Sequence, residues 1–168
     1  MLELVNVPDN ARKTGFVDTA MTRGTFVVQS GTFTAADITA LPANQKDLAG
    51  FAVAGDLKLV KAYVGETGRC YPMNKALIVP EGSDDANDDV LAGTSVVFFL
   101  EGQFRTTEYT DVTSTVDFGD YLKLSTSGTL TDEATLHTET SLSVARLVSL
   151  DDSQAAPVRK RLQFELLR

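Results

Sequence analysis

The sequence is poor in the residues that build disulfides, metal centres and aromatic platforms. It has one cysteine (Cys70), one histidine (His137) and no tryptophan. One cysteine cannot form an internal disulfide, and one histidine with one cysteine is too few for a zinc site. Four tyrosines are few for a sugar-stacking surface. We interpret Cys70 as a structural thiol and His137 as an exposed or sheet-edge residue, and we expect no metal and no cofactor.

Motifs for catalysis and nucleotide binding are also missing. The chain contains no G-x-S-x-G nucleophile elbow, no P-loop and no G-x-G-x-x-G. Carboxylates are plentiful, but none lies in the apolar context that raises a pKa for acid catalysis. We therefore expect no catalytic residues, and a protein that is not an enzyme.

Basic residues are the minority among the charged ones. Asp and Glu outnumber Lys and Arg by 23 to 15, which gives a formal net charge of -8. Proteins that bind nucleic acid present basic surfaces, so we expect no nucleic-acid partner. No apolar run reaches the length of a transmembrane helix, and the first residues lack the basic and apolar regions of a signal peptide. We expect no membrane partner and synthesis in the cytoplasm.

The sequence is rich in short β-prone runs. Residues 95–100 are Val- and Phe-rich and too short for a helix, and residues 103–109 alternate with period two. Residues 121–126 alternate again, and Ser127-Gly128 supplies a turn before a returning strand. These three consecutive strands predict a small antiparallel sheet that closes into a barrel or sandwich. Further strands are expected at residues 57–64, 142–150 and 162–167.

Helix content should be small, so the predicted fold class is all-β. Thr34 can cap a single helical turn that Leu41-Pro42 ends. Ser30-Gly31 predicts a hairpin between two short strands. Residues 1–23 read either as an extended N-terminal arm or, with equal weight, as a first strand over residues 2–7. Residues 24–168 then form a single β-rich domain.

The clearest loop is residues 81–89, which carries five carboxylates. Carboxylate oxygens suit Ca²⁺, but the spacing does not match the twelve-residue calcium loop, so a solvated loop is the preferred interpretation. Residues 159–161 form the one basic cluster. This cluster is either a solvated loop or a contact for an acidic partner, including the acidic loop of a second copy.

Residues 92–168 resemble the head decoration (capsid cement) proteins of tailed bacteriophages. The resemblance lies in G-T-S-V-V-F-F-L-E-G-Q-F-R-T-T-E-Y-T, G-D-Y-L-K-L-S-T-S-G-T-L-T, V-A-R-L-V-S-L and the final L-Q-F-E-L-L. It implies a virion structural protein, made in the bacterial host cytoplasm, that binds the assembled capsid and bridges major capsid subunits. It also implies a homo-oligomer, a dimer or a trimer. The capsid or inter-copy contacts would be Arg12, Lys13, Arg23, Arg159, Lys160 and Arg161.

Two other functions are compatible with the same β pattern. One is a different phage structural module, associated with the tail, the neck or a fibre. The other is an enzyme or carrier on a cupin- or lipocalin-like barrel. Most cupin enzymes bind their metal through several histidines, and the single His137 makes that alternative the weaker one.

Overall fold

The computed structural model describes residues 2–43, 50–63, 69–74, 89–107, 109–110, 112, 117–132, 143–151 and 161–167. These residues form β-structure with a single short α-helix among them, which confirms the expected all-β class. The elements are β1 (Leu2–Asn6), η1 (Asp9–Ala11), β2 (Arg12–Val17), β3 (Met21–Thr22), β4 (Phe26–Thr32), α1 (Ala35–Ala40), β5 (Leu57–Lys61), β6 (Tyr71–Asn74), β7 (Asp89–Val90), β8 (Ser95–Phe99), β9 (Gln103–Thr106), β10 (Tyr121–Leu124), β11 (Leu130–Asp132), β12 (Ser143–Asp151) and β13 (Arg161–Leu166).

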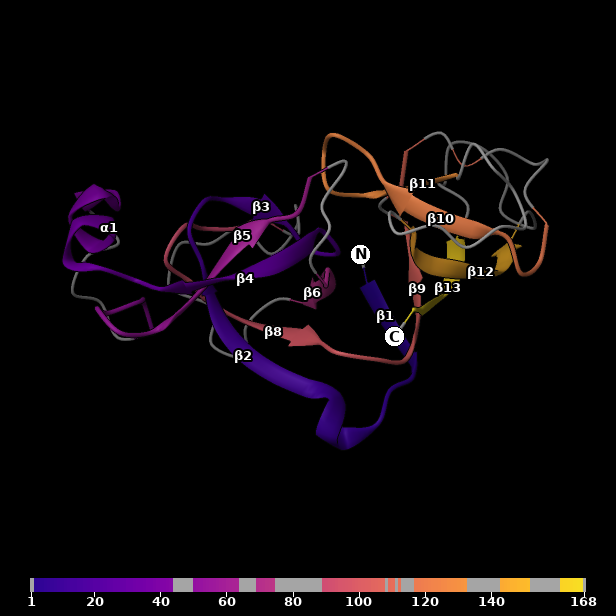
Figure 1. The fold of residues 1–168 in the computed structure, drawn as a ribbon, viewed down its shortest axis with the longest axis horizontal. Helices are drawn as coiled ribbons and strands as arrows, with labels where there is room; N and C mark the ends of the chain where they lie inside the picture. The colour runs from indigo at the N-terminus through magenta and orange to yellow at the C-terminus, as the bar shows by residue number, and fades with distance from the viewer. Residues whose placement is uncertain are drawn as a thin grey trace.

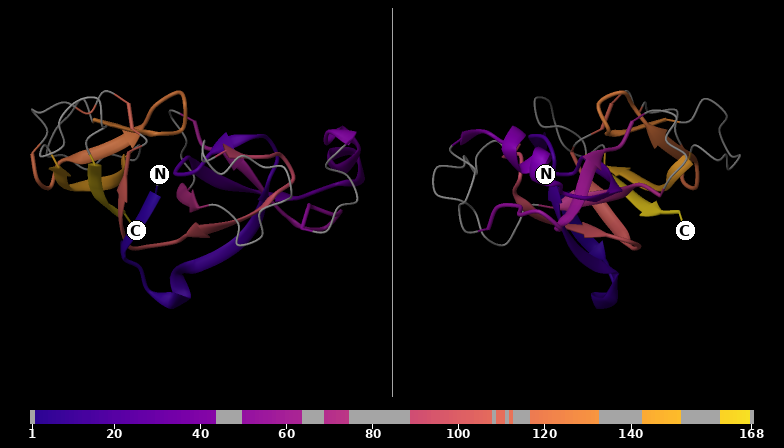
Figure 2. Two further views of the ribbon diagram at one scale, coloured as in Figure 1. Left: turned by 180° about the vertical axis from the view of Figure 1, so that it is seen from behind. Right: turned by 60° about the vertical axis from the view of Figure 1, so that its left-hand side comes forward.

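The fold has two lobes that lie side by side along the long axis of the molecule (Figure 1). The barrel lobe is a closed barrel with strand order β2-β5-β4-β6-β8, to which α1 and the small β3–β7 sheet are attached. The sheet lobe is a six-stranded sheet with order β1-β9-β13-β12-β10-β11. Figure 2 shows the molecule from behind and after a turn of 60° about the vertical axis.

The barrel closes through one parallel pair among antiparallel ones. β2 runs parallel to β5, with Val17 opposite Leu59, whereas β2 and β8 are antiparallel. The interior is filled by buried apolar side chains of alternate residues, because successive side chains of a strand point to opposite faces. Gly15 lies against this core: a Cβ there would stand 2.8 Å from Leu59 Cδ1. The barrel strands and the attached β3–β7 sheet together supply this cluster, which consists of Val17, Met21, Val27, Leu59, Met73, Val90, Val96 and Phe98.

The sheet lobe packs one face against the outside of the barrel. Phe164 of β13 and Phe104 of β9 stack with ring centroids 5.5 Å apart. Phe26 of the barrel contacts Phe164 at 5.9 Å, and Phe99 of the barrel contacts Phe104 at 5.2 Å. All four rings are buried. This aromatic cluster therefore joins the two lobes into one hydrophobic core.

Strand β8 takes part in both cores. Phe98 belongs to the barrel interior, and its neighbour Phe99 belongs to the core between the lobes. A strand that is covered on both faces is apolar at consecutive positions, which explains the unbroken apolar run in the sequence. The strand itself was predicted, but its partners were not: β8 belongs to the barrel, whereas β9, β10 and β11 belong to the other sheet.

The start of the chain is part of both lobes, which corrects the expected arm over residues 1–23. β1 pairs with β9, with Leu2 opposite Thr106, and Leu2 is buried. β2 then pairs with β8 from Arg12 opposite Phe99 onward. The alternative of a first strand over residues 2–7 matches β1.

The chain enters and leaves the barrel at one place. Leu100 N donates to Ala11 O at 2.8 Å, directly beside the pair of Arg12 and Phe99. β1 precedes this point and β9 follows it, and both lie in the sheet lobe. The barrel lobe is thus an insertion between the first and second strands of the sheet lobe in chain order.

The predicted hairpin at Ser30-Gly31 is not formed. β4 continues through these residues, and its pairing with β5 shifts register between Gln29 and Thr32. Gly31 has φ +72°, a conformation that glycine adopts at bulges without strain. The turn signal in the sequence therefore marks a bulge within one strand.

The short helix α1 begins as predicted, with Thr34 as its N-cap. Asp37 N donates to Thr34 Oγ1 at 3.2 Å, and Thr34 N donates to Asp37 Oδ2 at 2.8 Å, which forms a capping box. Lys58 Nζ lies 3.2 Å from Asp37 Oδ2 and ties the helix to β5. The backbone N–H and hydroxyl of Thr34, together with the Lys58 ammonium, hold the pKa of Asp37 below its ordinary value.

We expect Asp37→Asn to lower the thermal unfolding midpoint at neutral pH and to have less effect in acid. A carboxyl group with a lowered pKa in the folded state stabilises the fold above its unfolded pKa of about 3.9, and this contribution is lost as the pH falls through the lowered value. The measurement is the difference in midpoint between wild type and variant from about pH 7 to about pH 2. A difference that stays constant over this range would contradict the role of Asp37.

Candidate functional site

The contact between the lobes is completed by the turn that links β10 to β11. Phe26 N donates to Gly128 O at 2.9 Å, so the turn is bonded to the start of β4. Gly128 has φ +77°, and a Cβ there would stand 3.0 Å from both Ala62 O and Lys61 Cγ. Glycine is therefore needed at this position for two reasons, its backbone conformation and the close approach of the barrel.

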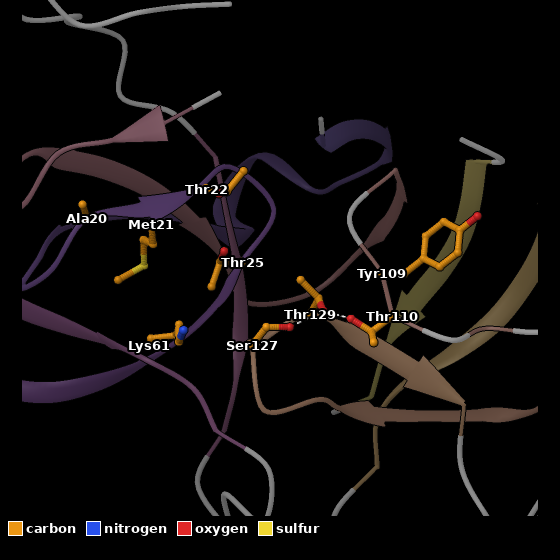
Figure 3. A pocket seen from close by; sticks show the side chains of 9 residues that line it. All are labelled: Ala20, Met21, Thr22, Thr25, Lys61, Tyr109, Thr110, Ser127 and Thr129. Carbon is orange, nitrogen blue, oxygen red and sulfur yellow. Dashed lines mark hydrogen bonds between the residues drawn. The ribbon is translucent and has the colours of Figure 1, made fainter. Parts of the chain in front are cut away.

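A pocket of about 420 Å³ lies between this turn and the barrel (Figure 3). Figure 3 shows Lys61 and Met21 at the barrel end, and Thr110 and Tyr109 at the sheet end. Among the described residues, its lining includes one lysine and no carboxylate, although acidic residues outnumber basic ones in the chain. The lining residues are Ala20, Met21, Thr22, Thr25, Lys61, Tyr109, Thr110, Ser127 and Thr129.

The hydroxyl groups at the sheet end of the pocket bond to one another. Thr129 Oγ1 lies 2.8 Å from Thr110 Oγ1, 3.0 Å from Ser125 Oγ and 3.0 Å from Ser127 Oγ. Ser125 Oγ and Ser127 Oγ are 2.7 Å apart. A hydroxyl group can donate or accept, so this network can rotate its protons to suit a polar group that enters. The pocket is suited to weak polar or anionic contacts.

A second hollow, of about 450 Å³, lies on the outer face of the barrel. Its lining includes Val28 and Val60, which are a cross-strand pair of β4 and β5. Tyr63 and Arg69 also line it, and both are exposed. Apolar side chains beside an arginine are typical of protein contact surfaces.

Four of the six predicted contact residues lie in the described part of the chain. Arg12 and Lys13 are exposed at the start of β2, and they make no ion pair with another described residue. Arg23 Nε donates to Asn74 Oδ1, a contact within the barrel lobe. Arg159 and Lys160 lie outside the described residues.

Arg161 is held by the sheet lobe. Its guanidinium Nη1 lies 3.6 Å from Glu3 Oε2, and Arg105 Nη1 lies 3.9 Å from the same oxygen. β1, β9 and β13 are neighbours in the sheet, which brings these three side chains together. The predicted set therefore divides: Arg12 and Lys13 face solvent, whereas Arg23 and Arg161 make contacts within the protein.

Of the two residues considered for metal binding or catalysis, the structure describes Cys70 but not His137. Cys70 is buried in the core between the lobes, which agrees with a structural thiol. His137 and the acidic residues 81–88 lie outside the described residues. Within the described part of the chain, no three His, Cys, Asp or Glu side chains gather as metal ligands. In the same part, no helix has the length and apolar character needed to span a membrane.

The large apolar side chain that is most exposed among the described residues was missed by the sequence analysis. Phe118 is 78% exposed, and it precedes β10 in the segment D-F-G-D. An Asp at the first position of a turn with Gly two residues later is a turn signal. That signal was present at residues 117–120 and could have identified Phe118 as the exposed tip of a turn.

No protein-family model, no curated protein and no solved structure matches this chain.

Proposed function

We propose that the protein is a non-enzymatic structural component of a tailed-bacteriophage virion. It binds the assembled head and bridges neighbouring major capsid subunits, as head decoration or cement proteins do. Its partners are the major capsid protein and other copies of itself, and its location is the outer surface of the capsid. The proposal extends the resemblance noted for residues 92–168.

The order of strands in the sheet lobe is the observation that carries the proposal. The quoted segments of the resemblance form β9, the β10–β11 hairpin, β12 and β13, which are all members of one six-stranded sheet. The first quoted segment also contributes β8, which the barrel incorporates. The part of the chain that suggested the family thus supplies most of one lobe.

The distribution of exposed groups suits a bridging protein. The barrel lobe exposes Val53 and Tyr63, and the sheet lobe exposes Val5 and Phe118. The molecule is elongated, with the lobes at opposite ends (Figure 1). Contacts from both lobes to different subunits would each be weak, and a repeating lattice would convert them into strong attachment.

The proposal is tested by mixing the purified protein with heads of its source phage that lack it. We expect the protein to sediment with expanded heads and to remain in the supernatant with free capsid subunits. Cryo-electron microscopy of decorated heads then locates the density. Density on the tail, the neck or a fibre would contradict the head-binding function and would favour the alternative, another phage structural module.

Reversing the charge of both Arg12 and Lys13 to Glu should weaken head binding about tenfold at low salt, because exposed ion pairs contribute up to about 1 kcal/mol each. The salt dependence of binding should weaken as well. Arg161→Gln is the control, since that side chain is paired with Glu3. Binding constants measured by sedimentation at two salt concentrations test this, and equal losses in both variants would contradict a specific role for the β2 cations.

A further inference from the structure

Phe118 differs from the other phenylalanines of the chain. The sequence has nine, and the structure buries seven of them almost completely and Phe16 in part. Phe118 is 78% exposed, more than any other large apolar residue of the described chain. An aromatic ring in water is unfavourable by the hydrophobic effect, and Tyr, Trp and Phe are enriched at the centres of protein interfaces.

The turn that carries Phe118 is closed by hydrogen bonds between Asp117 and Asp120. Asp120 N donates to Asp117 O at 3.1 Å, and Asp117 N donates to Asp120 Oδ2 at 2.7 Å. Gly119 has φ +92°, with no atom within 4 Å of a Cβ built there. The carboxyl group of Asp120 is fully buried. These bonds close the turn on itself and hold the Phe118 backbone at its tip.

The same turn is fastened to the core of the sheet lobe. Gly119 N donates to Leu147 O at 2.9 Å, and Leu147 N donates to Asp120 O at 2.8 Å. Leu147 belongs to β12 and is buried in the core between the lobes. A backbone fixed in this way loses little conformational freedom on binding, so more of the contact energy of Phe118 appears as affinity.

We propose that Phe118 inserts into an apolar socket on the capsid surface whose rim carries cationic groups. The cationic rim follows from charge: Asp117 is exposed next to Phe118 in the chain, and the chain as a whole has a net charge of -8. A complementary rim steers the approach and rejects acidic surfaces. This inference rests on the proposed function and names the contact by which the sheet lobe would hold the head.

Head binding of wild type, Phe118→Ala, Phe118→Tyr and Asp117→Asn tests the inference. A hot-spot aromatic truncated to alanine weakens binding about 30-fold or more, so we expect that loss for Phe118→Ala. Phe118→Tyr keeps the ring but adds a hydroxyl group that an apolar socket cannot pair, so it should bind more tightly than Phe118→Ala and less tightly than wild type. Asp117→Asn should bind less tightly and with a weaker salt dependence. Thermal unfolding of all four proteins should coincide, because the exposed ring contributes little to the core.

Each other outcome has a distinct meaning. If wild type and Phe118→Ala bind heads equally, the socket is overturned and the proposed function stands. If wild type does not bind heads, the proposed function itself fails. Light scattering of the free proteins tests whether Phe118 instead binds a second copy of the chain. If wild type is oligomeric and Phe118→Ala is monomeric, Phe118 lies in the contact between copies, and the capsid socket is overturned.

Discussion

Replacing Phe164 by alanine should lower the free energy of unfolding by about 3–5 kcal/mol, the usual cost of removing a buried aromatic ring. Phe164 has no exposed surface, and its ring lies between Phe104 of its own sheet and Phe26 of the barrel. The cavity would open at the contact between the lobes, so neither lobe can close it alone. Urea unfolding followed by far-ultraviolet circular dichroism measures the change in the free energy of unfolding.

The matched control for this prediction is the same substitution at Phe118. That ring is 78% exposed, and a surface substitution of this kind changes stability by about 0.5 kcal/mol or less. The pair of variants thus separates loss of a buried ring from loss of any phenylalanine. A Phe164→Ala protein as stable as Phe118→Ala would show that the aromatic cluster does not hold the lobes together.

Gly128→Ala should lower the free energy of unfolding by about 2–5 kcal/mol, from two additive causes. A left-handed backbone conformation costs a non-glycine residue about 1–2 kcal/mol, and Gly128 has φ +77°. The new Cβ would also stand 3.0 Å from Ala62 O, and crowding in a packed region typically costs about 1–3 kcal/mol. Urea unfolding measures the total, and loss of the Phe26–Gly128 hydrogen bond would appear as faster amide exchange at Phe26.

Gly31→Ala isolates the first cause, the cost of the left-handed backbone conformation. Gly31 has a similar φ of +72°, but no atom lies within 4 Å of a Cβ built there. This variant should show the backbone cost alone, about 1–2 kcal/mol. The additional loss of unfolding free energy in Gly128→Ala, compared with Gly31→Ala, then measures how tightly the turn packs on the barrel. Equal losses at the two glycines would mean that the turn is free to move away from the barrel.

Local patterns were sufficient to predict several strands. In β9, Phe104 and Thr106 are buried while their neighbours are partly exposed, as the period-two alternation requires. The β10–β11 hairpin forms around the Ser127-Gly128 turn, and Thr34 caps α1. In these cases the deciding interactions lie within a few residues of one another, so the sequence contains them directly.

Partners far apart in the chain were not predictable from local patterns. The apolar run at residues 95–99 is compatible with any doubly covered strand, and nothing in it specifies β2 and β6 as neighbours. β1 was equally compatible with an arm because only Leu2 of its five residues is buried. Its place depends on β9, about a hundred residues later.

The candidate contact residues show the same limit. The basic residues were selected by their charge alone. Charge does not reveal that Arg161 forms an ion pair with Glu3. Phe118 was missed because an aromatic residue next to a strand normally belongs to the core. Its exposure depends on the bonds of residues 117–120 to Leu147 of β12, a strand that is distant in sequence.

The insertion of the barrel has a consequence for biosynthesis. On the ribosome, the strands of the barrel are all available once residue 99 has emerged, whereas β1 must wait for β9 and the sheet lobe must wait for the C-terminal β13. Domains generally fold as units during translation, so we expect the nascent chain to carry a finished barrel while the other lobe is still unassembled. Phe26 and Phe99 would then be exposed on the outer surface of that barrel. The later strands of the sheet lobe would fold by packing against this surface.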